Sequence, residues 1–377
     1  MNRLAVLLSV SGNGGVESQM FRLVQRFVEQ GVDVDFLIVL RAGQSLPPLD
    51  HPRLRVLDLG VHSTRLALPS LIRYLRAEKP RVLLVCKDRA IRVAVLARRL
   101  AGTSTRIVGQ LNTYLSAALS RKAALVRWLR LAPMPFIYTR VDQVIAVAEG
   151  VAQDTLKITG LPEERVSVIR NPVVSQRLYD LSRAPIDHPW FNDSGASIIL
   201  GAGRLTPQKD FATLIRAFAR VRAHKDCRLV ILGEGRLRPE LEELAQNLGI
   251  ADRVAFPGFV NNPYAYMARA SLFVLSSAWE GSPNVLTEAV ALGRPVVATD
   301  CPSGPRELLQ DGRYGPLVPV GDADKLAEAM LETLQHPLPP ETIREAAAEY
   351  TVENSARRYL EVLGFWPATL TAQNDTA

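Results

Sequence analysis

Short apolar runs alternate with amphipathic segments along almost the whole chain. Val, Ile and Leu fill the short runs, whereas apolar residues recur every three or four positions in the segments between them. This alternation is typical of βαβ units, in which parallel strands form a buried sheet and helices cover its faces. We therefore predict an α/β fold that repeats the same architecture in both halves of the chain.

The apolar runs predict strands at similar intervals in the two halves. Those of the first half are expected at residues 4–9, 34–40, 82–86, 106–110 and 144–147. Those of the second half are expected at residues 198–201, 229–232, 254–256, 272–275 and 295–298. Two separate parallel sheets follow from this order, and a chain of 377 residues is long enough for two domains.

A stretch rich in turn-forming residues separates the two series of strands. Residues 174–196 contain Pro, Asp, Asn, Ser and Gly without a helical or strand period, so we interpret them as a linker. The predicted domains are an N-terminal Rossmann-like domain over residues 1–173 and a C-terminal one over 197–340. Residues 341–365 have a helical period outside any βα unit, so we expect a helix that crosses back to the N-terminal domain. Residues 366–377 are interpreted as a loose tail.

Charge is distributed unevenly between the two halves. Residues 1–185 carry 27 Lys+Arg against 14 Asp+Glu, a balance of +13, whereas residues 186–377 carry 18 against 24, a balance of −6. The overall composition, with 47% hydrophobic and 22% charged residues, is ordinary for a globular protein. The asymmetry predicts that the two domains have different partners and that the first faces an anionic one.

Membrane-spanning and disulfide-rich proteins are both disfavoured by the sequence. Arginines interrupt every long apolar region, so no stretch reaches the ~18 apolar residues of a spanning helix. Residues 1–10 are interpreted as a first buried strand rather than a signal peptide. The cysteines Cys86, Cys227 and Cys301 are far apart and lack metal-ligand spacing, which argues against a disulfide framework. We therefore expect a cytoplasmic protein.

The strongest local motif is a pair of glutamates with seven residues between them. Glu280 follows the predicted strand 272–275, and Glu288 lies inside the helix expected from Val285 onward. Open α/β sheets bind ligands at the carboxyl ends of their strands, where helix amides suit a phosphate and carboxylates accept hydrogen bonds from sugar hydroxyls. The alternative is that both glutamates are solvated surface charges. The candidate residues of this motif are Glu280, Ser282, Asn284, Val285 and Glu288.

A glycine-rich loop with two cations follows the predicted strand 198–201. Arg204 can bind two phosphate oxygens through its planar guanidinium, and Lys209 supplies a mobile charge five residues later. Gly203 in this loop and Gly233 after the next strand would let the backbone approach a ligand closely. The alternative for the first loop is an ordinary solvated loop with Asp210 as a helix cap.

Another glycine-rich loop lies near the start of the chain. Residues 12–17 read Gly-Asn-Gly-Gly-Val-Glu, between a predicted strand and a predicted helix. Glu17 occupies the position of the last glycine of the G-x-G-x-x-G pattern, so dinucleotide binding is disfavoured. Gly14 and Gly15 remain candidates for a loop that faces a phosphate.

Taken in order, the motifs resemble those of the retaining glycosyltransferases of family four, and the resemblance covers nearly the whole chain. The matching motifs are GGVE at 14–17, VIAV at 144–147, VIRNP at 168–172, GR at 203–204, KD at 209–210, GEG at 233–235, FPGFV at 256–260, the glutamate pair, GPRELL at 304–309 and GPLVP at 315–319. The resemblance implies the GT-B fold, in which two Rossmann-like domains with parallel sheets face each other across a cleft.

The resemblance also implies a role for the charged residues of the C-terminal half. In the family, the residues that match Arg204 and Lys209 bind the diphosphate of the donor. The residue that matches Glu288 holds the ribose hydroxyls, and the one that matches Glu280 contacts the transferred sugar. These cations and the helix amides would neutralise the leaving group, so neither a metal nor a cofactor is expected beyond the nucleoside diphosphate sugar that serves as co-substrate.

Further donor contacts follow from the same resemblance. Phe259 and Val260 would meet the nucleotide base, while Gly14 and Gly15 would line the cleft opposite the diphosphate. One position departs from the family, which commonly has a histidine just after the fourth strand of the acceptor domain that reaches the donor sugar, where this chain offers Gln110 or Asn112. An amide can make the same hydrogen bond, although it cannot carry a proton as an imidazole does. We therefore include Asn112 among the catalytic candidates.

A segment rich in basic and bulky apolar residues spans positions 119–140. Its cations and apolar residues are Arg121, Lys122, Arg127 and Arg130, interleaved with Leu125, Trp128, Leu129, Met134 and Phe136. This mixture suits a helix in the headgroup layer of an anionic membrane. The alternative is that Leu125, Trp128 and Leu129 cover the sheet while the cations stay solvated. A nucleic-acid partner is disfavoured because no recognised binding module accompanies the charge.

These patterns together predict an enzyme that transfers a hexosyl or N-acetylhexosaminyl group from a nucleoside diphosphate sugar to an acceptor hydroxyl, with retention. The acceptor is expected to be a lipid-linked or envelope glycan, with the protein placed at the inner face of the cell membrane. A nucleotide-sugar epimerase of similar architecture is an alternative, because it uses the same donor without an acceptor. A non-catalytic nucleotide-sugar-binding protein at the membrane is another.

Overall fold

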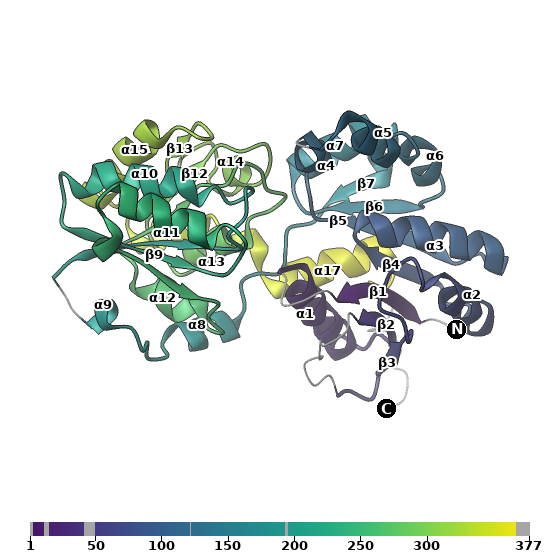
Figure 1. Cartoon of the computed structure of the whole chain (residues 1–377). Coiled ribbons are helices and arrows are strands. Elements are labelled where there is room, and N and C mark those ends of the chain that lie inside the picture. Colours follow the sequence, from purple (N-terminus) through teal and green to yellow (C-terminus); the bar gives the residue numbers. More distant parts are fainter. Residues whose placement is uncertain (1–2, 11–14, 41–49, 121, 193–194, 367–377) are drawn as a thin grey trace, which may run out of the picture. The chain divides into compact units, whose positions relative to one another are not determined.

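The chain divides into two units, each built around its own parallel sheet (Figure 1). The computed structural model describes all residues except 1–2, 11–14, 41–49, 121, 193–194 and 367–377. The first unit comprises Met1–Pro172 and Val352–Ala377, and the second comprises Val173–Thr351. Gly14 and Arg121, both named above, lie outside the described residues.

The sheet of the first unit has seven strands in the order β3-β2-β1-β4-β5-β6-β7. They are β1 (Leu4–Val10), β2 (Val34–Leu40), β3 (Leu54–Asp58), β4 (Val82–Cys86), β5 (Arg106–Leu111), β6 (Gln143–Ala146) and β7 (Val166–Val168). Residues of β1 alternate between two cores, with Ala5 and Leu7 on one face and Leu4, Val6 and Leu8 on the other, all fully buried. Because both faces are covered, such strands consist of continuous apolar runs.

Helices cover both faces of this sheet. They are α1 (Gly15–Glu29), α2 (Leu68–Glu78), α3 (Asp88–Ala101), α4 (Leu115–Ser120), α5 (Ala124–Leu131), α6 (Met134–Tyr138), α7 (Glu149–Thr159) and α17 (Val352–Leu363), with a 3₁₀ turn η1 (Glu163–Arg165). One core takes residues from α1 and α17, including Phe27 and Tyr359 with ring centroids 6.3 Å apart. The other takes residues from α2, α3, α6 and α7.

The second unit repeats this architecture with six strands in the order β10-β9-β8-β11-β12-β13. They are β8 (Ser197–Ala202), β9 (Cys227–Leu232), β10 (Val254–Gly258), β11 (Leu272–Leu275), β12 (Val296–Thr299) and β13 (Leu317–Val318). The helices are α8 (Gln176–Ser182), α9 (Pro189–Asn192), α10 (Phe211–Arg222), α11 (Arg238–Asn247), α12 (Pro263–Arg269), α13 (Asn284–Ala291), α14 (Pro305–Leu308), α15 (Ala323–Gln335) and α16 (Pro340–Glu345), with η2 (Ala251–Arg253) and η3 (Ala348–Tyr350). Residues of α10, α11 and α15 share one core, and residues of α8, α12, α13 and α16 share the other.

Local sequence explains where several helices begin and end. The helices α3 and α7 end at Gly102 and Gly160, whose φ values of 66° and 67° are strained for residues with a side chain. Asp322 caps α15, because its side chain accepts a hydrogen bond of 2.9 Å from the backbone amide of Lys325.

Every predicted strand is present, within one or two residues at each end. The structure adds β3, β7 and β13, which the sequence analysis missed. β3 is an edge strand whose residues are all at least partly exposed, so it lacks a continuous apolar run. β7 and β13 have only three and two residues, too few to show a period.

The boundary between the units differs from the expected linker. Residues 174–196 contain α8 and α9, and Leu178 of α8 is 1% exposed in the core of the second unit. The segment 341–365 is likewise divided, because α16 belongs to the second unit and α17 packs against α1 in the first (Figure 1). Backbone amides of Val173 and Val174 both donate to the carbonyl of Tyr350 at 2.9 Å, so the two connections between the units lie side by side.

Candidate functional site

The two cation and glutamate motifs of the second unit meet at the carboxyl edge of its sheet. Nζ of Lys209, in the loop after β8, lies 2.6 Å from Oε1 of Glu280, in the loop after the neighbouring strand β11. The two side chains are 15% and 8% exposed. The Ser277 hydroxyl donates to the same carboxylate oxygen at 2.7 Å. This buried carboxylate is therefore neutralised within the unit.

Further hydrogen bonds join these two loops. The backbone amide of Ala278 donates to the carbonyl of Gln208 at 2.8 Å, and the hydroxyl of Ser276 donates to the carbonyl of Lys209 at 2.8 Å. Asp210, directly after Lys209, has a φ of 43°, a conformation that is costly for a residue with a side chain. Lys209 is therefore held by its backbone as well as by its ion pair.

Two glycines of the predicted site are needed for the close approach of loops. A Cβ atom on Gly203 would lie 2.8 Å from Cε of Lys209, and one on Gly233 would lie 2.0 Å from the carbonyl oxygen of Gly203. Their φ values of 151° and 127° also favour glycine. A side chain at Gly233 would displace the backbone of the loop at Gly203, and one at Gly203 would displace the side chain of Lys209.

Arg204 differs from Lys209, although only five residues separate them. It is exposed, and across the residues that the structure describes its guanidinium makes no ion pair or hydrogen bond. An exposed cation without an acidic neighbour, next to a buried ion pair at the carboxyl edge of a sheet, can bind an anionic ligand.

The N-terminus of α13 lies in the same loop as Glu280. The helix begins at Asn284 and Val285, with neither an acidic residue in its first turn nor a side-chain cap. The preceding turn, which contains Ser282, is fixed because the Ser303 hydroxyl donates to the carbonyl of Gly281 at 2.7 Å. The positive end of this helix is therefore not offset by a carboxylate of its own first turn.

Glu288 lies within α13, and counted as whole residues Glu288 and Glu280 are 9% and 6% exposed. The Tyr264 hydroxyl donates to Oε1 of Glu288 at 3.5 Å. Burial of both carboxylates shows that the alternative of two solvated surface charges is wrong. Buried charges need polar partners, and a ligand hydroxyl is one such partner.

Two residues after β10 complete the candidates in this unit. Phe259 is 57% exposed, whereas Val260 packs partly against the core. Gly258 before them has a φ of 85°, and a Cβ atom there would lie 2.5 Å from Oε1 of Glu234. The turn thus presents an aromatic face to solvent.

The first unit holds the remaining candidates at the carboxyl edge of its own sheet. Gly15 begins α1, and Nε2 of Gln110 at the end of β5 donates to Oδ1 of Asn112 at 3.3 Å. Within the described parts of the chain, Nδ2 of Asn112 is buried and has no hydrogen-bond partner. An orphaned buried donor is costly, so this amide is available to a ligand.

Sequence reasoning missed an ion pair at the same edge. Nζ of Lys87, directly after β4, lies 2.8 Å from Oε1 of Glu17 and 3.1 Å from the carbonyl oxygen of Ser9. Lys87 has a φ of 76°, which is strained for a lysine. The sequence offered one sign of a functional role for Lys87, which is its position directly after a buried strand. No recognisable motif surrounds it.

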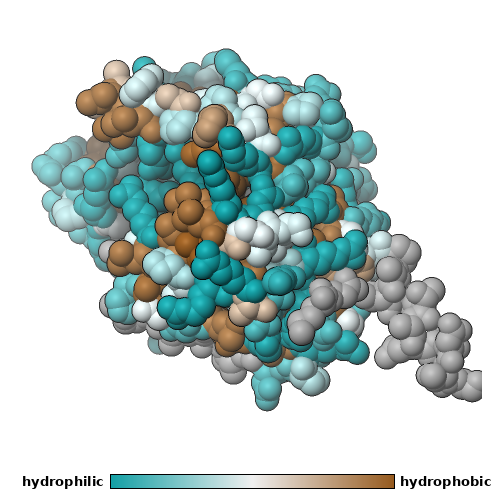
Figure 2. Space-filling model, turned by 90° about the vertical axis from the view of Figure 1, so that its right-hand side faces the viewer, coloured by the Kyte–Doolittle hydropathy of each residue, from teal (hydrophilic) through white to brown (hydrophobic). Residues whose placement is uncertain are grey.

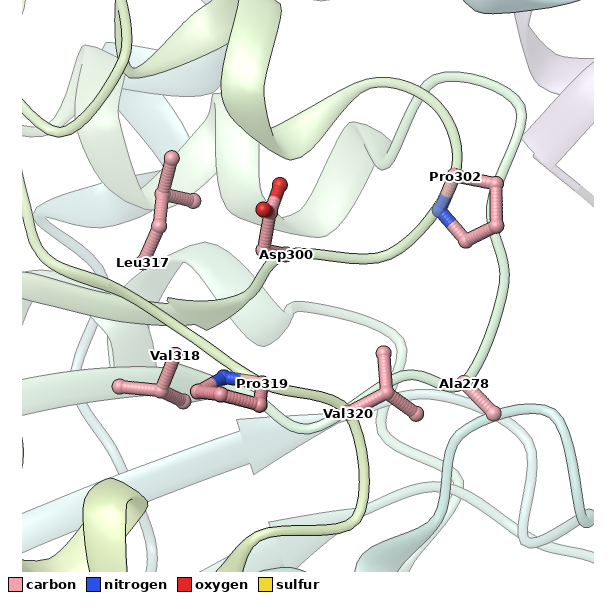
Figure 3. A pocket seen from close by; sticks show the side chains of 7 residues that line it. All are labelled: Ala278, Asp300, Pro302, Leu317, Val318, Pro319 and Val320. Carbon is pink, nitrogen blue, oxygen red and sulfur yellow. The ribbon is translucent and has the colours of Figure 1, made fainter.

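A pocket of about 610 Å³ also lies in the second unit (Figure 3). Its lining consists of Ala278, Asp300, Pro302, Leu317, Val318, Pro319 and Val320. None of the predicted site residues is among them. Asp300 is the one carboxylate in the lining, and its Oδ1 accepts a hydrogen bond from Nε of Arg306 at 3.1 Å. The pocket is therefore mostly apolar, and Ala278 in its lining belongs to the loop that carries Glu280.

No cysteine is suited to act as a nucleophile. Burial raises the pKa of the Cys301 thiol to about 12, and the nearby negative charge of Glu280 acts in the same direction. Burial also raises the pKa of Cys86 to about 12 and that of Cys227 to about 11. All three thiols are therefore protonated at neutral pH.

Comparison with known proteins finds similarity to glycosyltransferases in both halves of the chain. The description "Glycosyltransferase Family 4" matches residues 13–177, and "Glycosyl transferases group 1" matches residues 196–336. Both descriptions are of glycosyltransferases, and each matches one half of the chain. One relative, the lipopolysaccharide core biosynthesis glycosyltransferase LpsE of Rhizobium meliloti, is 29% identical over 331 residues, which cover 84% of this chain and 85% of that protein.

Another relative is a Campylobacter jejuni enzyme named N-acetylgalactosamine-N,N'-diacetylbacillosaminyl-diphospho-undecaprenol 4-alpha-N-acetylgalactosaminyltransferase. It is 34% identical over 199 residues, which cover 53% of this chain and 52% of that protein. This match therefore spans only about half the length of that relative.

The solved structure of Anabaena Alr3699/HepE in complex with UDP and glucose shares the fold. The match has a TM-score of 0.78 at 18% identity and covers 97% of this chain and 100% of that chain. The predicted GT-B fold, with two Rossmann-like domains and parallel sheets, is thereby confirmed. Among the described residues, no helix is long and apolar enough to cross a bilayer, and no group of three acidic, His or Cys side chains is arranged to hold a metal ion.

Proposed function

We propose that this chain transfers a sugar from a nucleoside diphosphate sugar to a hydroxyl of an acceptor, with retention at the anomeric carbon. The observation that carries the proposal is the arrangement of the loops after β8 and β11. The Lys209–Glu280 ion pair joins these loops, Arg204 in the first loop has no partner among the described residues, and the second loop leads into the N-terminus of α13. A cation, a helix end and a buried carboxylate are the groups that a charged sugar donor requires.

We assign the diphosphate to Arg204, Lys209 and the first-turn amides of α13. Arg204 has no competing partner within the described chain, so it can bind phosphate oxygens without first breaking an ion pair. Lys209 is held by Glu280 and would share its three donors between that carboxylate and the diphosphate. Gly203 and Gly233 keep the Lys209 loop in place, and Ser282 lies in the turn before α13.

We assign the nucleoside to Glu288 on α13 and to Phe259 and Val260, which follow β10. Glu288 would accept hydrogen bonds from the ribose hydroxyls, supported by the Tyr264 hydroxyl. The exposed ring of Phe259 would stack on the base, with Val260 beside it. The Anabaena protein binds UDP according to its description, which supports a nucleoside diphosphate as ligand.

The proposed chemistry uses one face of the sugar. The acceptor oxygen forms a bond to the anomeric carbon on the face from which the diphosphate leaves, and the acceptor proton passes to the departing phosphate oxygen. Glu280 would orient the sugar hydroxyls rather than attack, because Lys209 and Ser277 already bind one of its oxygens. Losing one donor to the developing charge typically lowers the rate about 100- to 1,000-fold.

The acceptor is assigned to the first unit. The orphaned amide of Asn112 and the strained Lys87 at the carboxyl edge of that sheet offer donors to hydroxyl or phosphate groups. The name of the Campylobacter relative specifies a diphospho-undecaprenol acceptor, and the Rhizobium relative is named for lipopolysaccharide core biosynthesis. We infer a lipid-linked or envelope glycan acceptor, and a hexosyl or N-acetylhexosaminyl group as the one transferred.

The test is a panel of nucleoside diphosphate sugars, incubated with and without glycan acceptors. We expect sugar transfer only when the acceptor is present. NMR of the product should show the same anomeric configuration as in the donor. An altered donor released without acceptor would indicate an epimerase, and donor binding without turnover would indicate a binding protein. Because cations and helix amides neutralise the leaving group, EDTA should not change the rate.

A further inference from the structure

The helix α5 presents its apolar side to solvent. None of its eight residues is buried, and Leu125, Val126, Trp128 and Leu129 are 67%, 46%, 63% and 56% exposed. At 100° per residue these four side chains fall on one side of the helix. The alternative that they cover the sheet is therefore wrong.

The C-terminal end of α5 contacts the rest of the unit. Arg130 and Leu131 are only partly exposed, and Leu131 packs against the core below. The backbone carbonyl of Arg130 accepts a hydrogen bond of 2.6 Å from Arg92 on α3. Contacts with the rest of the unit thus hold the helix in this orientation.

The apolar surface continues onto the next helix. Phe136 on α6 is 65% exposed, and the guanidinium carbon of Arg140 lies 3.9 Å from the centroid of its ring. Figure 2 shows the side of the first unit on which α2, α3 and α6 lie in Figure 1, with brown apolar and teal polar surface interleaved. Exposed aromatic and aliphatic side chains mixed with cations are typical of surfaces at the water–lipid interface.

A cluster of arginines lies directly beside α5. Partial burial lowers the pKa of Arg130, and so do the positive charges of Arg89, Arg92 and Arg65, while Asp88 acts in the opposite direction. Arg89 and Arg65 are exposed. Residues 113–141 contain five Lys+Arg and no Asp or Glu. The surface is therefore strongly cationic as well as apolar.

We propose that α5, α6 and the adjoining arginines form a docking surface for an anionic lipid bilayer. In it Leu125, Val126, Trp128, Leu129 and Phe136 enter the headgroup layer, and Lys122, Arg127 and the arginine cluster bind lipid phosphates. A second copy of the chain fits less well, because a symmetric contact would bring like charges together. A nucleic acid would use the cations but leave the aliphatic side chains without a partner.

The experiment is flotation of the full chain with vesicles of phosphatidylcholine, with and without about 30% phosphatidylglycerol, at low and high salt. Binding is expected only to the anionic vesicles and should weaken at high salt. Lys122→Gln with Arg127→Gln should lower the partition coefficient about 30-fold, because each cation near an anionic surface contributes roughly a factor of five. Trp128→Ser with Leu129→Ser should lower it about tenfold or more through lost apolar contact.

Matched controls lie in the second unit. The double variant Arg216→Gln, Lys325→Gln removes two exposed cations, and the double variant Leu248→Ser, Leu338→Ser removes two exposed leucines. We expect neither variant to change flotation. Thermal unfolding checks that every variant is folded. Donor turnover with a water-soluble acceptor should be unchanged in the α5 variants, so failure of docking and failure of the proposed activity are distinguishable.

Four results would overturn the proposal. The first is the absence of binding to anionic vesicles at low salt, and the second is equal binding by the α5 variants and their controls. The third is a dimer in light scattering that the Trp128→Ser, Leu129→Ser variant dissociates, since this would assign the surface to a second copy. Tighter binding to a single-stranded oligonucleotide than to anionic vesicles would likewise contradict it.

Discussion

The two units share one architecture but differ in charge and in the chemistry of their loops. Each has a parallel sheet with helices on both faces, yet the first unit carries 27 Lys+Arg against 16 Asp+Glu, a balance of +11, and the second carries 18 against 22, a balance of −4. At the carboxyl edge of its sheet, the second unit has close-packed glycines and two buried glutamates, whereas the first has one buried glutamate, Glu17, and the orphaned amide of Asn112. Because the sheets are alike, the loops after the strands account for the difference.

The comparison also extends to the two ion pairs at these edges. Lys209 and Glu280 are 15% and 8% exposed, while Lys87 and Glu17 are 34% and 6% exposed. The Lys209–Glu280 pair is thus the more buried one, so removal of one of its members should destabilise the protein more. This difference can be tested by breaking each pair.

The largest effect is expected for Lys209→Met. It leaves Glu280 buried without its cation, which should lower the free energy of unfolding of the second unit by about 3 kcal/mol or more. Hydrogen exchange of the β8 and β11 amides measures this change. Lys325→Met, at an exposed lysine of the same unit, is the control and should change exchange little. Equal exchange in Lys209→Met and Lys325→Met would contradict a stabilising role for the pair. Lys87→Met, which breaks the more exposed pair of the first unit, should lower the free energy of unfolding less than Lys209→Met does.

Arg204→Ala should separate activity from stability. Because Arg204 is exposed and unpaired within the described chain, its loss should not change unfolding, but sugar transfer should fall about 100-fold or more through lost stabilisation of the leaving group. Steady-state kinetics and thermal unfolding measure the two quantities. Arg216→Ala provides the control at another exposed arginine. Unchanged transfer in Arg204→Ala would place the diphosphate elsewhere.

The two glutamates should respond differently to the loss of charge. Glu288→Gln should weaken nucleotide binding about 10- to 100-fold, since a hydrogen bond to a charged group contributes roughly 1.5–3 kcal/mol. Glu280→Gln should lower turnover more than affinity, because we assign it to the reacting sugar. Calorimetry with the nucleoside diphosphate and kinetics with the intact donor distinguish the two effects. Equal losses in both measurements for both variants would refute the assignment.

The smallest effect is expected in the first unit, at Asn112. Asn112→Ala should raise KM for the acceptor or lower turnover by about tenfold, through the loss of one hydrogen bond, with donor binding unchanged. Asn112→His restores the side chain that is common in the family and should recover part of the rate. A loss of donor affinity in Asn112→Ala would instead place this residue at the donor.

Much of the fold was predictable because both sheets are covered on both faces. Strands such as β1 and β4 are continuous apolar runs, so their positions were recognised to within a residue or two. The edge strand β3 was not recognised, since an exposed strand has no reason to be uniformly apolar. The helix α8 was missed because it is seven residues long, too short for its period to stand out among turn formers.

The candidate site was predictable where local motifs carried it. Gly203, Lys209 and Glu280 were identified from their order along the chain, and the structure brings Lys209 and Glu280 together. Their mutual ion pair was not predictable, because it depends on the adjacency of β8 and β11, which are 70 residues apart in sequence. Lys87 was overlooked for the same reason, since its partner Glu17 lies on a different element.

The position of α17 has a consequence for the synthesis of the chain. Tyr359, Leu360 and Leu363 complete the core that α1 and β1 begin, yet all of Val173–Thr351 is made before them. On the ribosome, the second unit can finish folding while the first still exposes the apolar groove that α17 will fill. Domains normally fold in order from the N-terminus, and here that order is reversed. The nascent first unit therefore keeps apolar surface exposed until α17 emerges.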